Sequence, residues 1–302
     1  MGCIRIGTCS WTYPSWKGLV YSSAKPADML REYAARYDTV EIDRWFWSLF
    51  GGEPRLPETS DVRAYRSSVP DGFRFTIKVP NSVTLTHAYR EEKTDPLVEN
   101  PHFLSQALFR EFLDRLGPMH DALGPLLFQF ESLNKQKMPS EKKFLERLEE
   151  FASGLPSGFT YGIEIRNGNY LNDSYFECLR RSRLVPVLLQ GYWMPPVDAL
   201  LGDRAAWFEG SGTVVIRLHG PDRGEIEKLA NKEWNRIVAP KDEELGRIAR
   251  VVKKLVGSGV DIYLNVNNHY EGSAPITIDR LRERLGPAGA GGGLPGPLSD
   301  VE

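Results

Sequence analysis

The stretch YGIEIRNGNY, residues 161–170, shows the alternation on which the fold prediction rests. Glu164 and Arg166 share one face of an extended strand, and the isoleucines at 163 and 165 share the other. In most soluble domains such a charged face meets water and the apolar face meets the core. If helices cover the apolar face of a barrel strand, the charges point into the barrel instead. The rest of the sequence helps to choose between these interpretations.

Similar β-rich runs recur along the chain with amphipathic helical patterns between them. The eight strand candidates are residues 4–10, 39–43, 73–79, 125–131, 161–166, 185–190, 213–219 and 261–267. The helical candidates are residues 26–37, 60–69, 103–119, 140–155, 173–182, 203–209, 241–256 and 276–285. Strand and helix alternate eight times, which predicts the α/β class and a single TIM-type (β/α)8 barrel. We expect the barrel domain to span residues 1–285, followed by a disordered, flexible Gly/Pro-rich C-terminal tail over 286–302.

Composition narrows the class of protein. The 302 residues are 41% hydrophobic and 26% charged, and these are ordinary globular values. The formal net charge of −2 offers no overall attraction to a polyanion, so a nucleic-acid surface would have to be local. The three cysteines are scattered and form no C-x-x-C pair, which is typical of a reducing cytoplasm. We expect a cytoplasmic protein with no secretion signal and no membrane partner, because no apolar run of 18 residues occurs.

Polar residues gather late in the strands, on the face opposite the apolar one. In a barrel wrapped by helices this face points inward, and the strand ends form the C-terminal mouth where barrel enzymes build their sites. The residues expected to converge there are Glu41, Asp43, Lys78, Gln129, Glu131, Glu164, Arg166, Arg217, His219, Asn265 and Asn267. Carboxylates beside a histidine suit acid–base chemistry, and cationic side chains suit an anionic substrate. The structural alternative is an ion-pair network that holds the barrel together.

Aromatic residues follow many of the same strand ends. They are Trp11, Tyr13, Trp16, Trp45, Phe46, Trp47, Tyr89, Tyr170, Tyr192, Trp193 and Tyr270. Aromatic rims stack on sugar faces or on bases, which favours a substrate with such a moiety. The alternative is that these side chains pack the loops against one another.

Several common chemistries lack their sequence motifs. The chain contains no Walker loop, no G-x-G-x-x-G after a strand, no G-x-S-x-G elbow and no H-E-x-x-H. Three histidines near the mouth, His87, His219 and His269, leave a divalent metal as an alternative, because acids are predicted nearby. We predict no metal ligands and no cofactor.

Seven blocks of the sequence resemble one family in the same order. They are IGTCSWTYPSWKGLVY, YDTVEIDRWFW, GFRFTIKVPNSVTLTH, LGPLLFQF, YGIEIRNGNY, VVIRLHG and DIYLNVNN. They resemble the domain of unknown function 72 family, also called YecE-like proteins, from about Ile4 to Leu285. The resemblance implies a TIM-type barrel without a firmly established activity, and proposals for the family lean on the endonuclease IV and xylose isomerase class of barrels. It highlights Ser10, Trp11, Tyr13, Trp16, Glu41, Phe46, Lys78, His87, Gln129, Glu164, Arg166, Arg217, His219 and Asn267.

This chain departs from the family pattern at three places. Asp43 stands where relatives usually carry asparagine, which adds a charge that could recruit a cation. Residues 167–170 read NGNY where relatives usually read His-Pro-x-Trp, and APITI replaces the late Asn-Ala helix start. If the family histidine acts in chemistry, Asn167 changes that chemistry or its substrate.

We therefore expect an enzyme, of the hydrolase or isomerase type, acting on a small-molecule or sugar-phosphate substrate. Glu164, Glu41, His219 and Asp43 are the predicted acid–base residues. The predicted substrate-binding residues are Lys78, Arg166, Arg217, Gln129, Trp11, Tyr13, Trp16, Phe46, His87, Asn265 and Asn267. Two other hypotheses remain: a nucleic-acid-binding protein or endonuclease IV-like phosphodiesterase, and a non-catalytic metabolite binder. The sequence does not indicate an oligomeric state.

Overall fold

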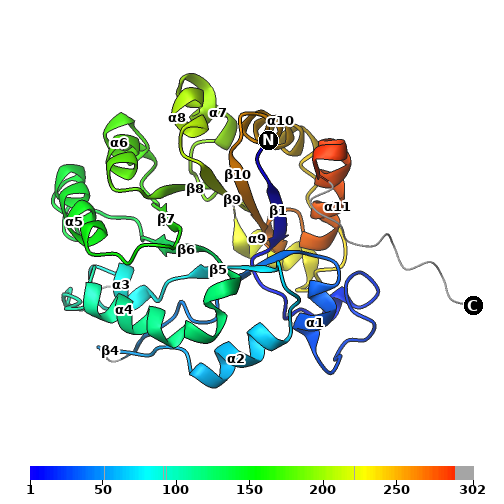
Figure 1. The fold of residues 1–302 in the computed structure, drawn as a ribbon, viewed down its shortest axis with the longest axis horizontal. Helices are drawn as coiled ribbons and strands as arrows, with labels where there is room; N and C mark the ends of the chain where they lie inside the picture. Colours follow the sequence, from blue (N-terminus) through cyan, green and yellow to red (C-terminus); the bar gives the residue numbers. More distant parts are fainter. Residues whose placement is uncertain (51, 91, 93, 221, 290–302) are drawn as a thin grey trace, which may run out of the picture.

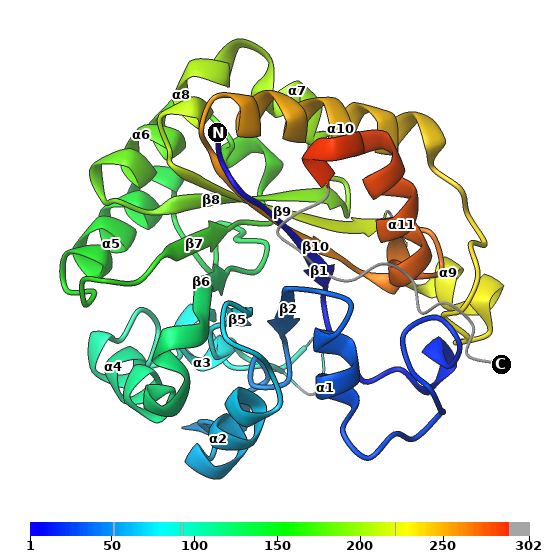
Figure 2. The ribbon, with the colours of Figure 1, turned by 45° about the vertical axis from the view of Figure 1, so that its right-hand side comes forward.

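The computed structural model describes residues 1–50, 52–90, 92, 94–220 and 222–289. Eight parallel strands form one sheet that curves into a barrel, and the helices lie outside it (Figures 1 and 2). The strands are β1 (Ile4–Thr8), β2 (Thr39–Ile42), β5 (Arg74–Lys78), β6 (Leu123–Gln129), β7 (Tyr161–Glu164), β8 (Val185–Gly191), β9 (Thr213–Gly220) and β10 (Asp261–Val266). Their order is β1-β10-β9-β8-β7-β6-β5-β2, so neighbours in the barrel are neighbours in the chain.

A tyrosine closes the barrel where the two ends of this order meet. The backbone N–H of Thr8 donates to the Tyr33 hydroxyl at 2.9 Å, and that hydroxyl donates to the carbonyl of Thr39 at 3.0 Å. The hydroxyl therefore bridges β1 and β2. The strands approach so closely that a Cβ at Gly7 would lie 2.0 Å from the Thr39 carbonyl oxygen, and only glycine fits there.

Helices separate the strands and cover their outer face. They are α1 (Met29–Ala34), α2 (Thr59–Ser67), α3 (Asn81–Thr84), α4 (Gln106–Arg115), α5 (Glu141–Ser153), α6 (Asp173–Arg181), α7 (Val197–Leu201), α8 (Ala205–Glu209), α9 (Arg223–Ala230), α10 (Asp242–Gly257) and α11 (Ala274–Leu285). Side-chain caps fix several starts: Ser140 accepts from the N–H of Lys143, and Asn172 accepts from that of Tyr175. Burial of their apolar stripes stabilises the helices more than their intrinsic propensity does.

The predicted barrel is confirmed, and each of the eight predicted strands lies within about two residues of its observed bounds. Each predicted helical segment also contains a helix, although the segment 103–119 ends as an α-helix at Arg115 and continues as a 3-10 turn over Gly117–Ala122. Sequence patterns missed the short helices α3, α7 and α9, and the hairpin of β3 (Leu49–Phe50) and β4 (Glu53–Pro54). Short elements carry too few periods of hydrophobic pattern to be recognised.

The predicted tail begins at Gly286, and residues 286–289 form a 3-10 turn. Residues 290–302 lie outside the described residues, so the prediction of disorder there stays a prediction. No helix in the described part of the chain is long and apolar enough to cross a membrane.

The strand faces divide as the alternation predicts. Ile163, Ile216 and Leu264 point outward into the main core that the helices cover. The inward-facing Leu127, Val187 and Val215 form a separate small apolar cluster, against which Tyr263 packs. The barrel is therefore plugged by apolar side chains in its middle, and the polar side chains above this plug form the floor of the mouth.

Candidate active site

A cavity of about 330 Å³ opens at the C-terminal mouth of the barrel. Its walls come from inward-facing strand ends and from the loops that follow them. The lining residues are Cys9, Glu41, Asp43, Phe46, Trp47, Lys78, Leu85, Tyr89, Gln129, Glu131, Arg166, Tyr192, Arg217, His219, Arg223, Asn267 and His269. This volume is at the low end of the range for small-molecule sites, about 300–1,000 Å³.

The floor of the cavity is an ion-pair network centred on Arg217. Its Nε and Nη2 donate to the two carboxylate oxygens of Glu41 at 2.8 and 2.6 Å. Its Nη1 donates to Glu164 at 2.5 Å and to the side-chain carbonyl of Gln129 at 3.1 Å. The Arg217 side chain is 2% exposed, and both glutamate side chains are 0% exposed. We name Arg217, Glu41, Glu164 and Gln129 the inner layer, because every charge in it is paired.

Glu164 is held between two arginines. One oxygen accepts from Arg217, and the other lies 2.6 Å from Nη2 of Arg166. Burial would raise the pKa of this carboxyl, but Arg166 and Arg217 overcome burial and lower it below its usual range. Glu164 thus stays ionised, and it does not line the cavity. These contacts fit the network alternative for Glu164 better than a proton-transfer role.

Lys78 and Asp43 lie above this floor and are unpaired. The register aligns Glu41 with Thr76 and Ile42 with Ile77, so the next positions, Asp43 and Lys78, are lateral neighbours. The Lys78 ammonium lies 3.6 Å from the centroid of the Phe46 ring. Neither charged group forms a hydrogen bond or ion pair with a described side chain. We name Asp43, Lys78 and Phe46 the outer layer.

The surroundings of the mouth shift the pKa values of Lys78 and Asp43 toward pH 7. Burial, opposed in part by the nearby acids and aided by the charge of Arg217, lowers the pKa of Lys78 to about 8. Desolvation by the walls of the mouth and the charge of Glu41 raise the pKa of Asp43 to about 6, although this side chain keeps contact with solvent. Groups of such pKa exchange protons efficiently near neutral pH.

His219 is a neutral imidazole in the wall. Burial and the positive charges of Arg217, Arg166 and Lys78 lower its pKa well below the usual range. Its Nε2 lies 3.7 Å from the Cys9 sulfur. Burial and the charge of Glu41 raise the pKa of that thiol well above the usual value, so the pair is uncharged. His219 is therefore suited to hydrogen bonding and not to carrying a positive charge.

Three further side chains form a relay along the rim. The side-chain oxygen of Asn267 accepts from the backbone N–H of His269 at 2.9 Å and contacts its Nδ1 at 2.5 Å. The Nε2 of His269 lies 3.0 Å from Glu227, which also pairs with Arg223. Burial lowers the pKa of His269 despite the contact with Glu227. This series of contacts holds the side chains of Asn267 and His269 in fixed positions.

Aromatic rings line opposite sides of the mouth. Trp47 lies beside both Phe46 and Tyr89, with ring centroids 5.2 and 5.7 Å apart, and it is 60% exposed. Across the mouth, Tyr192 packs against Arg166, whose guanidinium carbon is 4.9 Å from the ring centroid. The ring of His219 lies 5.5 Å from that of Tyr192. The predicted aromatic rim is present, but only these members belong to the cavity wall.

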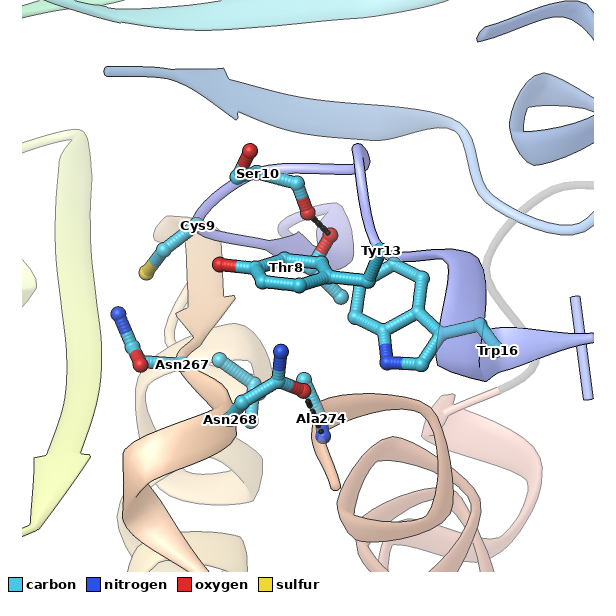
Figure 3. Close-up of a pocket in the computed structure, with 9 residues that line it drawn as sticks. Thr8, Cys9, Ser10, Tyr13, Trp16, Asn267, Asn268 and Ala274 are labelled. Atoms are coloured by element: carbon cyan, nitrogen blue, oxygen red, sulfur yellow. Dashed lines mark hydrogen bonds between the residues drawn. The ribbon is translucent and has the colours of Figure 1, made fainter. Parts of the chain in front are cut away.

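Most of the other aromatic candidates pack loops, whereas Trp193 is 90% exposed and lies outside the cavity wall. Trp16 is fully buried against Tyr13, with ring centroids 4.7 Å apart, and Trp11 meets Tyr65 edge-on at 5.0 Å. Figure 3 shows Tyr13 and Trp16 around a crevice beside Asn268, whose side-chain oxygen accepts from the N–H of Ala274. The crevice has no room for a water molecule. Trp11 and Trp16 therefore hold the loop after β1 and lie away from the cavity.

Two more predicted residues lie outside the cavity wall. His87 contacts the Thr86 hydroxyl through Nδ1 at 3.0 Å, and it does not line the cavity. Asn265 is fully buried below Glu41, to which its side-chain amide donates at 3.2 Å. The residues predicted at the mouth or its rim that the structure brings together in the wall are Glu41, Asp43, Phe46, Trp47, Lys78, Tyr89, Gln129, Glu131, Arg166, Tyr192, Arg217, His219, Asn267 and His269.

Cys9, Leu85 and Arg223 line the cavity without having been predicted. Cys9 lies two residues after Gly7 on the inward face of β1, so the alternation could have identified it. Arg223 is the first residue of α9, and its side chain pairs with Glu227 one turn further on. The short helix α9 was not predicted, so no pattern placed its first residue at the mouth.

Asn167, the departure from the family histidine, is a structural residue here. Its side-chain oxygen accepts from the N–H of Leu133 at 2.7 Å, and its amide donates to the carbonyl of Leu133 at 2.9 Å. It therefore ties the loop after β7 to the loop after β6. Among residues 1–50, 52–90, 92, 94–220 and 222–289, no three His, Cys, Asp or Glu side chains are grouped to hold a metal ion.

Sequence comparison identifies one family. The family described as "Protein of unknown function DUF72" matches residues 5–297. The UPF0759 protein YecE of Escherichia coli K12 is 27% identical over 168 residues, which are 55% of this chain and 50% of that protein. The same values hold for YecE of strain O157:H7. The aligned region thus spans about half the length of the curated relatives.

Solved structures share the fold. A DUF72 family protein from Enterococcus faecalis V583 superposes with a TM-score of 0.65 at 17% identity, covering 93% of this chain and 95% of that one. A DUF72 family protein from Thermotoga maritima MSB8 gives a TM-score of 0.63 at 21% identity, covering 93% and 97%. At these identities the likeness supports the barrel fold alone.

Proposed function

The chain belongs to the DUF72 family of unknown function, and we propose that it is an acid–base enzyme for a small, anionic, sugar-like substrate. The observation that carries this proposal is the unpaired outer layer in a cavity whose inner layer is fully paired. Lys78 is half-buried and Asp43 is open to solvent in the mouth. A partly buried charge without a partner costs stability, so an unpaired acid and amine side by side favour a role with a ligand.

Asp43 is the proposed proton-transfer residue. Its carboxyl has a pKa of about 6, contacts solvent in the mouth and is not committed to an arginine. Glu41 and Glu164 are bound to Arg217, so the acid–base role predicted for them passes to Asp43 in this proposal. His219 would donate or accept a hydrogen bond as a neutral imidazole.

The substrate class follows from the walls. Lys78, Arg166 and Arg223 supply positive charge around the opening, which suits a phosphate or carboxylate group. Phe46, Trp47 and Tyr192 supply ring faces, which suit the apolar face of a sugar-like body. The compact volume supports a small molecule over a nucleic-acid strand, which needs an extended groove. We also propose a cytoplasmic location, in which the free thiols Cys3, Cys9 and Cys178 would stay reduced.

A panel of monosaccharide phosphates, followed by proton and phosphorus NMR, tests this function. We expect turnover of at least one member, and a loss of about 100-fold or more in the Asp43→Asn variant. Asp114→Asn changes an exposed acid on α4 and is the matched control. Binding without turnover would identify a metabolite binder, and salt-sensitive binding of oligonucleotides with no sugar-phosphate binding would identify the nucleic-acid alternative. Either result overturns the proposal.

A further inference from the structure

The surroundings of Lys78 differ from those of a lysine that only binds an anion by its charge. It extends inward from the end of β5 into the cavity, with its Nζ over the Phe46 ring. An aromatic face attracts a cation but takes up no proton from it and is a weaker partner than a carboxylate. The amine is therefore held in place, open to the cavity and not bound to an acid within the described part of the chain.

Burial is the largest influence that favours the neutral amine of Lys78, and the nearby charges act in both directions. Burial and the nearby Arg217 disfavour the ammonium, whereas Glu41, Glu164 and Asp43 favour it. The two glutamates accept hydrogen bonds from Arg217, and Glu164 is also paired with Arg166, so both carboxylates already have cationic partners other than Lys78. With a pKa of about 8, about a quarter of the amine is neutral at pH 7.5. A free lysine side chain is almost entirely protonated at that pH.

We propose that Lys78 is a nucleophile that forms an imine with the carbonyl carbon of a small anionic aldehyde or ketone. This inference rests on the proposed function and narrows its substrate class to carbonyl compounds with a phosphate or carboxylate group. Desolvated lysines beside another cation act in this way because the neutral amine, and not the ammonium, attacks a carbonyl.

The step balances without an oxidant, a reductant or a cofactor. The Nζ lone pair attacks the carbonyl carbon, and the carbon–oxygen π electrons move to oxygen. The nitrogen then loses a proton and the alkoxide oxygen gains one, which gives a neutral carbinolamine. Protonation of its hydroxyl allows the carbon–oxygen bond to break while the nitrogen lone pair forms the carbon–nitrogen double bond, so that water leaves and an iminium, the protonated imine, remains. The iminium withdraws electrons from the neighbouring carbon, and loss of its N–H proton gives the neutral imine.

Asp43 is placed to move the protons of this step. It occupies the position beside Lys78 on the adjacent strand, and its carboxyl is free of arginine. A carboxyl with a pKa of about 6 can accept the proton from the attacking nitrogen and return it to the departing hydroxyl. The pairing of an amine nucleophile with a proton-transfer group explains why both remain unpaired.

Arg166 and the cavity dimensions select the carbonyl compound. Arg166 lines the wall above Glu164 and lies against Tyr192, so its remaining N–H groups are available to an anionic group. A space of about 330 Å³ suits a carbonyl compound of three to six carbons with one anionic group. A neutral ketone of the same size lacks the group that Arg166 would hold.

Borohydride trapping tests this assignment. The full-length protein is incubated with dihydroxyacetone phosphate, pyruvate or acetone, reduced with sodium borohydride and measured by intact mass spectrometry and peptide mapping. We expect at least one anionic probe to add once, with a mass gain of the probe less one oxygen atom, on the peptide that contains Lys78. Acetone should label it at least tenfold less.

Three variants make the result specific. Lys78→Met should abolish the adduct, and Lys78→Arg should abolish it while keeping the positive charge. Lys142→Met, which removes an exposed lysine of α5, should leave it unchanged. Thermal unfolding of each variant verifies that it is folded. Labelling spread over surface lysines, or equal labelling of Lys78→Met and the parent protein, would overturn the assignment.

Binding measurements separate this inference from the function on which it rests. Titration of inorganic phosphate and glucose 6-phosphate, followed by calorimetry, reports the anion site without any imine chemistry. If these probes bind and no anionic carbonyl is trapped, the nucleophile is wrong and the acid–base function stands. If neither binding nor trapping occurs, both are wrong.

Discussion

The inner and outer layers of the mouth use the same kinds of residue in opposite ways. In the inner layer, Arg217 donates two hydrogen bonds to Glu41, one to Glu164 and one to Gln129. In the outer layer, Asp43 and Lys78 lie one inward-facing position higher, and neither contacts a group of opposite charge among the residues that the structure describes. Glu41 lies on β2 and Asp43 follows its last residue, only two positions later, yet Glu41 is scaffold and Asp43 is available to a ligand.

Whether a charged side chain has an oppositely charged partner, and not its residue type, distinguishes the structural residues of the mouth from those available to a ligand. Removing one member of a buried ion pair destabilises the protein, because its partner is left unpaired in a medium of low polarity. An unpaired charge already lowers the stability of the native protein, so its removal should raise the free energy of unfolding. The two layers should therefore respond to substitution with opposite signs.

Arg217→Met should have the largest effect. It leaves Glu41 and Glu164 buried near Arg166 alone, and we expect a loss of about 3–5 kcal/mol in the free energy of unfolding. Urea unfolding at pH 7 measures this loss. Arg223→Met breaks the exposed pair with Glu227 and should cost less than about 1 kcal/mol. Equal losses in the two variants would show that the inner layer is not a scaffold.

Lys78→Met should stabilise the protein at neutral pH. The native pKa of about 8 lies below the ordinary value of 10.5, so the ammonium is disfavoured in the native state at every pH below about 8. The parent protein recovers this cost between about pH 8 and 10.5. Methionine keeps the apolar stem over Phe46, so we expect a gain of about 1–2 kcal/mol at pH 7 that disappears near pH 10.5. A loss at pH 7 would contradict the unpaired state of Lys78.

Asp43→Asn should give a smaller gain with the opposite pH dependence. The native pKa of about 6 lies above the ordinary value of 3.8, so ionisation costs native stability as pH rises from about 4 to 6. The variant should match the parent protein below about pH 4 and exceed it above pH 6. Because Asp43 contacts solvent, we expect less than about 1 kcal/mol. Thermal unfolding across this pH range measures the difference, and a gain that is already complete at pH 4 would contradict it.

The alternation of polar and apolar residues in the sequence was sufficient to predict the barrel fold and most residues of the cavity wall. The pairs Glu164–Arg166 and Arg217–His219 were placed on inward faces because side chains two apart share a face. A network pairing Glu164 with Lys78 or with Arg217 was one sequence-based alternative, and the structure has the pair with Arg217. The pair of Arg217 with Glu41 was not predictable, since 176 residues of sequence separate them and only barrel closure brings them together. The separation of the two layers therefore emerges only in three dimensions.

The aromatic rim was predicted less well because strand ends do not determine loop paths. Trp16 and Phe46 both follow strands, yet Trp16 packs against Tyr13 and Tyr21, whereas Phe46 turns over Lys78. Loop packing depends on contacts with other loops that no local pattern encodes. Arg223 was missed because the short helix α9 that it begins was not predicted.

The pKa of Lys78 tests the central claim most directly. Lysine labelled with carbon-13 at Cε reports each amine by NMR during a pH titration, and Lys78→Arg assigns the signal. We expect a midpoint of about 8 for Lys78, whereas surface lysines should titrate near the ordinary value. A midpoint near 10.5 would show an ordinary, well-solvated or paired ammonium, and it would contradict the distinction between the two layers.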